Sequence, residues 1–134
     1  MQDFKKLRVW HVARELSVTV INALPERIGR KVPRLRSQTI RAATSVEWNL
    51  AEGCGRTGRT ELLQFVEIAL SSLNELEAQL SLARDTHIID NATHAHLHDR
   101  VDIVRRMLIS FMRTLQRRIA EDEQARRKRK GGDA

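Results

Sequence analysis

The 134-residue chain has few of the residues that β-folds and cross-linked folds require. Aromatic residues make up 4% and tyrosine is absent, which argues against a β-sandwich or β-barrel. The one cysteine, Cys54, cannot form an internal disulfide, so the chain fits a reducing compartment. No apolar run approaches the roughly 18 residues of a membrane span, and the first ten residues lack the apolar stretch of a signal peptide. We therefore expect a cytoplasmic protein with no membrane partner.

The length suits one domain, which is large enough to bury a core without a metal or disulfide. Apolar residues recur at steps of three and four in four segments, which begin near Lys6, Leu35, Thr60 and either Asn91 or Thr93. Their apolar faces are Val9, Ala13, Leu16, Val20 and Leu24; then Ile40, Ala43, Val46, Leu50 and Cys54; then Leu62, Val66, Ala69, Leu73, Leu76, Leu80 and Ala83; then Leu97, Val101, Val104, Leu108, Phe111, Leu115 and Ile119. With short connections, this pattern predicts an all-α fold, an up-down-up-down antiparallel four-helix bundle.

The ends of these segments carry recognisable stop and start signals. Pro25 ends the first helix, Gly53 and Gly55 supply left-handed or flexible positions after the second, and Thr60 is an expected N-cap of the third. The basic stretch at the end of the chain has no apolar partner, which indicates disorder. We expect a bundle over residues 1–122 and a basic, disordered tail over residues 123–134.

Charge is unevenly distributed along the chain, whose net charge is +7. Residues 1–60 hold 12 basic and 5 acidic residues, residues 61–125 hold 7 and 11, and residues 126–134 hold 5 and 1. Such asymmetry points to an anionic partner or to subunits that meet charge against charge.

The basic clusters are the strongest functional hint, because phosphate backbones attract such sequences. The candidate nucleic-acid-binding residues are Arg27, Arg30, Lys31, Arg34, Arg36, Arg126, Arg127, Lys128, Arg129 and Lys130. Arg106, Arg113 and Arg117 lie opposite the apolar face of the last helix. Few aromatic residues are present to stack on bases, so sequence-specific recognition of single strands is not expected. The alternative is that these charges serve solubility and pairing between subunits.

Several helices carry more apolar surface than one core needs. Trp10, Leu63 and Leu70 lie beside or away from the main apolar faces, as do Ile21, Ile103, Met107, Ile109 and Met112. Either these residues are scattered on the surface, or a homo-oligomer buries them.

A polar stripe runs along the second helix, opposite its apolar face. Its members are Gln38, Arg41, Ser45, Asn49 and Glu52, and the third helix has a similar stripe that includes Gln64, Glu67, Ser71, Asn74 and Glu75. A solvated face is one reading. A buried network at a helix or subunit contact is another, in which Arg41 pairs with Glu52 or Glu75. A catalytic carboxylate pair has no accompanying nucleophile and base.

Two further motifs give weak signals. Residues 53–58 match G-x-G-x-x-G, but a helix precedes them, so we reject a dinucleotide site. Arg56 and Arg59 could hold a phosphate at a helix start, or the segment is a plain turn. One helical face carries His94, His98 and Asp102, but without the spacing of a strong metal site. Cys54 is a poor candidate for a nucleophile, because no histidine lies near it in the sequence. We expect no catalytic residue, metal or cofactor.

Residues 35–53, LRSQTIRAATSVEWNLAEG, resemble the signature of the four-helix-bundle proteins encoded in intervening sequences of 23S rRNA. Supporting pieces are residues 7–10, Pro25, Arg56 and residues 65–76, so the likeness covers roughly residues 3–90. Glu47 and Trp48 depart from it, because the family usually has a proline and a small residue there.

The resemblance implies an up-down four-helix bundle, commonly a ring-shaped homopentamer. The chain is also similar to the accessory variability determinant of diversity-generating retroelements, a basic pentamer that binds nucleic acid and a reverse transcriptase. We therefore expect a non-enzymatic homo-oligomer that binds RNA or DNA phosphates. The alternative is a scaffold that docks an acidic or nucleic-acid-bound protein such as a reverse transcriptase.

Overall fold

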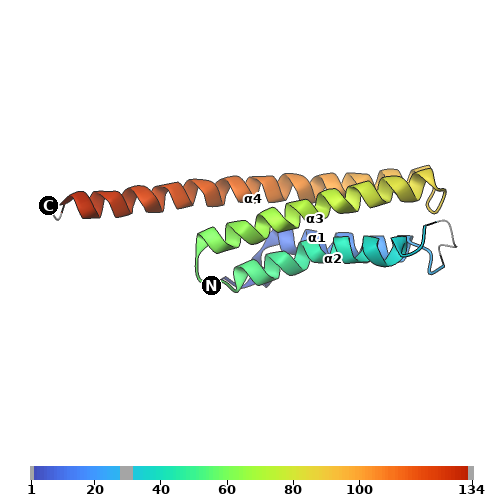
Figure 1. Ribbon diagram of the computed structural model, residues 1–134, viewed down its shortest axis with the longest axis horizontal. Helices are drawn as coiled ribbons and strands as arrows, with labels where there is room; N and C mark the ends of the chain where they lie inside the picture. The colour runs from blue at the N-terminus through green and yellow to red at the C-terminus, as the bar shows by residue number, and fades with distance from the viewer. Residues whose placement is uncertain (1, 28–31, 133–134) are drawn as a thin grey trace.

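The computed structural model describes residues 2–27 and 32–132, and in them the chain is helical with short connections. A short 3-10 helix, η1 (Phe4–Lys6), precedes four α-helices: α1 (Arg8–Ala23), α2 (Leu35–Cys54), α3 (Arg59–Asp85) and α4 (Asn91–Gly132). Successive helices run in opposite directions (Figure 1), and α1 packs on α2, α2 on α3, α3 on α4 and α4 on α1. The predicted up-down-up-down four-helix bundle is therefore confirmed.

The core is formed by the apolar faces that the spacing of three and four residues predicts. Every predicted face residue of α1 and α3 is buried, and Leu97, Val101, Val104, Leu108 and Leu115 are buried on α4. Ile40 and Phe111 are only partly buried and pack against the edge of the core. The agreement follows from the bundle geometry, because each helix presents one apolar stripe to a shared axis.

Helix starts differ from the predicted ones in their capping residues. Thr60 lies inside the first turn of α3, which begins after the extended Gly58 without a side-chain cap. At the start of α4, the Asp90 carboxylate accepts a hydrogen bond of 2.7 Å from the backbone N–H of Thr93. The prediction of Thr60 as an N-cap was therefore wrong, while the predicted start of α4 at Asn91 is confirmed.

Gly53 serves close packing rather than a left-handed turn. It is buried within α2, and a Cβ placed on it would lie 2.8 Å from Cβ of Phe65 and 2.9 Å from Cδ1 of Leu62. Gly55 caps the helix with a φ of −76°, an ordinary right-handed value. The predicted end of α2 at these glycines is confirmed, but their predicted left-handed conformation was wrong. A side chain at position 53 would force α2 and α3 apart.

The predicted disorder of residues 123–134 is contradicted as far as the structure describes the segment, since α4 continues to Gly132. Residues 123–132 extend past the rest of the bundle in Figure 1 and are all exposed; we call them the arm. The segment continues a helix that already exists, so it needs no new nucleus, and Glu, Gln, Ala, Arg and Lys are strong helix formers.

Candidate functional site

Two surfaces bring together many of the residues that the sequence singled out. The first is the arm with the adjoining face of α4, and the second is a groove between α2 and α3. The α1–α2 link is a third surface and the second basic region, at the opposite end of the bundle from the arm (Figure 1).

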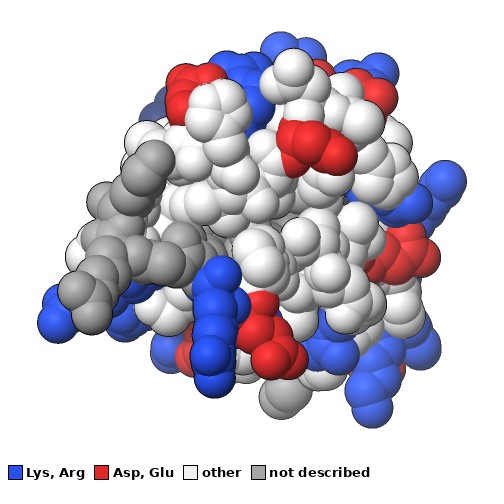
Figure 2. All heavy atoms as spheres, turned by 90° about the vertical axis from the view of Figure 1, so that its right-hand side faces the viewer, with Lys and Arg blue, Asp and Glu red and all other residues white. Residues whose placement is uncertain are grey.

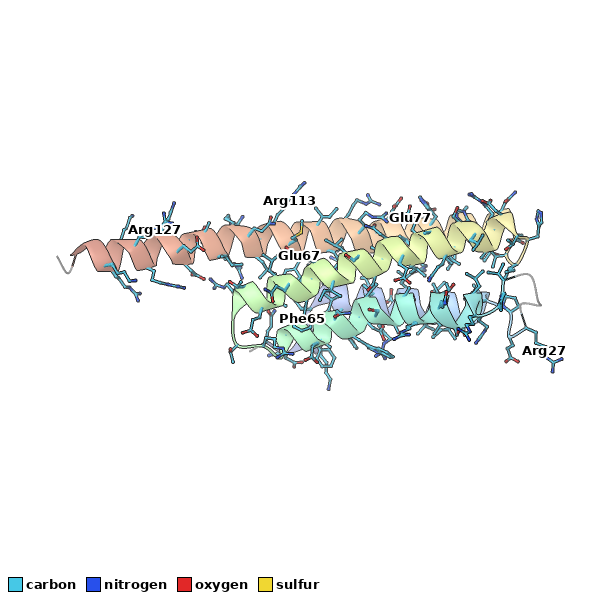
Figure 3. All side chains as sticks on the ribbon, in the orientation of Figure 1. Arg27, Phe65, Glu67, Glu77, Arg113 and Arg127 are labelled. Atoms are coloured by element: carbon cyan, nitrogen blue, oxygen red, sulfur yellow. The ribbon has the colours of Figure 1, made fainter. Side chains whose placement is uncertain are left out.

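The arm carries five consecutive cations with no packing partner. Arg126, Arg127, Lys128, Arg129 and Lys130 are exposed on the last turns of α4. Within the described ranges, the last polar contact between α4 and another helix joins Arg59 and Asp122. Nη1 of Arg59 donates to Oδ1 and Oδ2 of Asp122 at 2.9 and 2.7 Å. Beyond Asp122 the positive charge therefore faces solvent on every side. Figure 3 labels Arg127 on this projecting part of the helix.

A row of arginines leads from the bundle to the arm. Arg106, Arg113 and Arg117 lie exposed on one face of α4 and line a shallow hollow of about 420 Å³ with Ile109, Ser110 and Thr114. Arg117 lies 3.8 Å from Glu121, a loose exposed pair. The predicted position of these arginines opposite the apolar face is thus confirmed, and they extend the basic surface of the arm toward the middle of α4.

The link end offers a less uniform charge. Arg27 and Arg34 are exposed and Arg36 is half-buried, whereas Arg30 and Lys31 lie outside the described residues. Arg34 takes a left-handed φ of 70° just before α2. In Figure 2, which faces this end, lysines, arginines and carboxylates alternate around the rim and uncharged residues fill the centre.

The two basic regions do not form one site in a single chain. The link lies beside the start of α4 (Figure 1), and the 35 helical steps from Asn91 to Arg126 span about 50 Å at the helical rise. Figure 3 labels Arg27 and Arg127 at opposite ends of the molecule. A ligand that touches both would have to be long, or the two ends must act separately.

The second surface is a groove of about 560 Å³ between α2 and α3. Its walls are Gln38, Arg41, Ala42, Ser45, Trp48, Ser72 and Glu75. Four of these residues, Gln38, Arg41, Ser45 and Glu75, were predicted to be structural or interface residues. Trp48 separates this groove from a neighbouring hollow lined by Ala51, Glu52, Gly55 and Arg56, and it is 59% exposed, the most exposed large apolar side chain described.

The polar stripe of α2 divides into a partly buried centre and exposed ends. In the centre, the hydroxyls of Ser45 and Ser72 lie 2.8 Å apart, and Asn49 donates to the hydroxyl and carbonyl of Ser45 at 2.9 and 2.7 Å. At the end, Glu52 accepts from Arg56 at 2.8 Å. The suggested pairing of Glu52 with Arg41 is therefore wrong, because Arg56 lies one turn away on the same face of the chain.

Other predicted interface residues pack against side chains of the same chain. The ring of Trp10 lies 4.8 Å from that of Phe4, and the Arg14 guanidinium lies 4.9 Å from the Trp10 ring. Leu63 and Leu70 are partly buried against the core. These three residues contribute less exposed apolar surface than Trp48, which the sequence marked only as a departure from the family pattern.

Glu47 is the one buried carboxylate of α2. Its side chain is 3% exposed, and Arg14 donates to its Oε1 at 2.8 Å, while Oε2 has no partner among the described residues. Burial raises the pKa of Glu47 above its ordinary value, although the Arg14 charge opposes the shift. Glu47 is a structural group, since it faces α1 and no pocket.

The weak motifs do not assemble into a reactive site. Arg56 and Arg59 are each paired with a carboxylate, which leaves the start of α3 without the free cations of the suggested phosphate site. Burial raises the pKa of the Cys54 thiol, opposite to what a nucleophile needs. Among residues 2–27 and 32–132, no group of three His, Cys, Asp or Glu side chains is arranged to hold a metal ion.

The histidines instead belong to a polar contact between α3 and α4. His98 lies 3.3 Å from Glu77 and 3.6 Å from Asp102. Arg105 donates to Asp102 at 2.8 Å and also contacts Glu77, tying the two helices together. Sequence reasoning missed Arg105 as a cross-helix partner, although its position beside the buried Val104 is the available signal.

A four-helix bundle with a basic helical arm is the class of protein that these features define. The chain belongs to the 23S rRNA-intervening sequence protein family, because the sequence model of that family matches residues 5–110. A crystal structure of a protein of unknown function from the S23 ribosomal protein family, from Bacteroides thetaiotaomicron, is similar in fold. Its TM-score is 0.72 at 24% identity, covering 78% of this chain and 95% of that one.

No curated protein matches the chain. The family match ends at residue 110, so the arm lies outside it. In the described part of the chain, no helix has the length and hydropathy needed to cross a bilayer.

Proposed function

We propose that this protein is a non-enzymatic, homo-oligomeric accessory protein that binds the phosphate backbone of nucleic acid. The observation that carries the proposal is the arm, where five adjacent cations are exposed on a helix that has left the bundle. A structural role would leave such charges beside carboxylates, as it does for Arg56 and Arg59. The arm cations are instead free to neutralise phosphates and so to release the counterions condensed on a nucleic acid.

The arm is favoured over the link as the main contact. Carboxylates interrupt the cations around the link end (Figure 2), whereas the arm contains Glu123 as its only acidic residue. Arg106, Arg113 and Arg117 prolong the basic surface of the arm along α4. Arg27, Arg34 and Arg36 are assigned a secondary contribution.

Self-association through the α2–α3 groove is the second part of the proposal. Trp48 exposes 59% of its surface between two hollows, and a large exposed aromatic residue of this kind is typical of an interface. The groove also offers Arg41 and Glu75, charges of both signs, to a second copy. A homo-oligomer would place several arms on one particle and multiply their affinity for a long phosphate chain.

Salt titration of binding tests the phosphate contact. The full chain and a version ending at Asp122, which keeps the Arg59 pair, are titrated with labelled duplex while fluorescence anisotropy is measured. We expect affinity to fall steeply with salt, with a log–log slope that is about four to five smaller in the truncated chain. Absence of binding at about 50 mM salt would overturn the proposal.

Light scattering of the purified chain tests the assembly. We expect a mass of several subunits, and a shift toward the monomer for Trp48→Ser, with Ile68→Ser as the matched control on another exposed apolar residue. A monomeric mass for the unaltered chain would contradict self-association. An acidic protein that binds the arm more tightly than duplex does would favour the scaffold alternative.

A further inference from the structure

We propose that the arm recognises double-stranded DNA by lying in its major groove. This inference rests on the proposed phosphate binding and narrows the partner to one form of nucleic acid. It is carried by three properties of the arm: its length and continuity, the distribution of its cations, and the lack of an apolar face.

The arm is a straight continuation of α4 and stands clear of other helices. Its ten residues, 123–132, are about 15 Å long at the helical rise. A helix with side chains is about 10–12 Å across, and the major groove of B-DNA is about 12 Å wide. The arm therefore has the size of a groove-binding helix and the clearance to enter a groove (Figure 1).

The cations of the arm surround its axis. Residues 126–130 are consecutive, so each step turns by about 100° and the five side chains cover the full circumference. A helix that lies on a flat surface uses one stripe of contacts. Cations on all sides suit a ligand that encloses the helix, and the two strands that border a major groove present phosphates on both sides.

The composition of the arm disfavours other partners. Ala125 is its only apolar residue, so the arm has no face that could enter a membrane surface or a hydrophobic groove on a protein. It has no aromatic side chain to stack on the bases of a single strand. The major groove of A-form RNA is too deep and narrow for protein side chains to read.

Sequence preference should be weak. Gln124 is the only arm residue of the amide type that pairs with adenine. The arginines and lysines can donate to guanine, but cations that surround the helix axis mostly meet the phosphates on both sides of the groove, which carry no sequence information. The arm therefore positions the protein on the duplex through contacts with the DNA backbone and through the fit of the helix to the groove. It contributes little to reading the base sequence.

The test separates helical geometry from charge. Ala125→Pro breaks the helix before the five cations but keeps them all, and Ala125→Gln keeps both helix and charge. Far-UV circular dichroism confirms the loss of helix. Anisotropy then compares duplex DNA, duplex RNA and single-stranded DNA of one sequence at about 0.1 M salt.

We expect the unaltered chain and Ala125→Gln to bind duplex DNA about tenfold more tightly than duplex RNA, the effect of one to two phosphate contacts. In Ala125→Pro the ratio should fall toward one, and the salt slope for DNA should fall by about two. Equal affinity for the two duplexes, or an unchanged ratio in Ala125→Pro, would overturn the major-groove inference while leaving phosphate binding intact. Polyglutamate that competes as strongly as duplex DNA would overturn it too. Failure to bind any nucleic acid would overturn both proposals.

Discussion

The packed part of α4 and the arm belong to one helix, but different interactions hold them. The packed part of α4 buries residues against its neighbours, with a partly buried Phe111 in the wider gap before the last: Leu97, Val101, Val104, Leu108 and Leu115. Residues 123–132 are all exposed. The packed part is stabilised by burial, whereas the arm depends on helix propensity, on continuation from an existing helix and on cations near the C-terminal end of the helix dipole.

The comparison teaches that α4 is longer than the bundle requires. A helix that only completed the core could end soon after the half-buried Ile119. The continuation adds positive charge and length but no buried side chains. It lies beyond the family match to residues 5–110. The contrast assigns stability to one part of the helix and binding to the other.

The largest expected change in the free energy of unfolding comes from shortening a core side chain in the packed part. Leu108 is fully buried, and Leu108→Ala should lower the free energy of unfolding by about 2–5 kcal/mol, through lost transfer energy and a cavity. In the arm, Ala125→Gln should change it by less than about 0.5 kcal/mol. Urea denaturation followed by circular dichroism measures both. Equal losses of unfolding free energy in the two variants would contradict the distinction between the packed part of α4 and the arm.

The next effect concerns the close approach of α2 and α3 near the base of the arm. Gly53→Ala places a Cβ 2.8 Å from that of Phe65, and forced separation should cost about 1–3 kcal/mol. Gly58→Ala is the control, because a Cβ there meets nothing within 4 Å. Thermal and urea unfolding compare the two variants, and a Gly53→Ala protein as stable as the control would refute the packing role.

Ion pairs in the packed part and at the base of the arm also differ, since Glu47 is buried and Asp122 is exposed. The pKa of Glu47 is raised in the folded chain, so the folded state holds its proton more tightly than the unfolded state. Stability from this group is present below its ordinary pKa of 4.5 and is lost as pH rises through the raised value. Glu47→Gln should remove this decline.

Unfolding free energies measured from pH 4 upward, in steps of about one unit, follow the effect. The same substitution at the exposed Glu52 is the matched control. The result that would contradict this is a Glu47→Gln variant that becomes less stable than the unaltered chain as pH rises. Burial would then not be the dominant influence on the pKa of Glu47.

The smallest effect is expected at the base of the arm. Arg59 and Asp122 are both about half-exposed, and their coupling in a double-mutant cycle of Arg59→Gln and Asp122→Asn should be below about 1 kcal/mol. It should weaken as salt is added. A coupling well above that range would mean that the pair anchors the arm, which would then be part of the packed unit.

The fold could be predicted from the sequence because each helix needs one apolar stripe, and that stripe is visible as spacings of three and four. Contacts between side chains of two different helices could not be predicted as well from the sequence. The need for glycine at position 53 arises from Phe65 and Leu62 across the α2–α3 contact, and the partner of Arg105 arises from the register of α3 against α4.

The candidate sites show the same division. The basic residues are evident in the sequence as a run, but their lack of apolar partners predicts disorder and not the helix that they form. The continuation of a long helix through strong helix formers outweighs that lack. The groove residues Gln38, Arg41 and Ser45 were found by spacing, whereas Trp48 was not assigned to it, since only the α2–α3 arrangement places it at the groove edge.

Hydrogen exchange along α4, with and without duplex DNA, tests most directly the claim that the arm is the binding element of a stable bundle. In the free chain, amides near Leu108 should be strongly protected and those of the arm weakly protected, because unpacked helix ends open readily. Saturating DNA should protect the arm amides and leave the others unchanged. Protection that arises only at the link end or the α2–α3 groove, with none in the arm, would contradict the account.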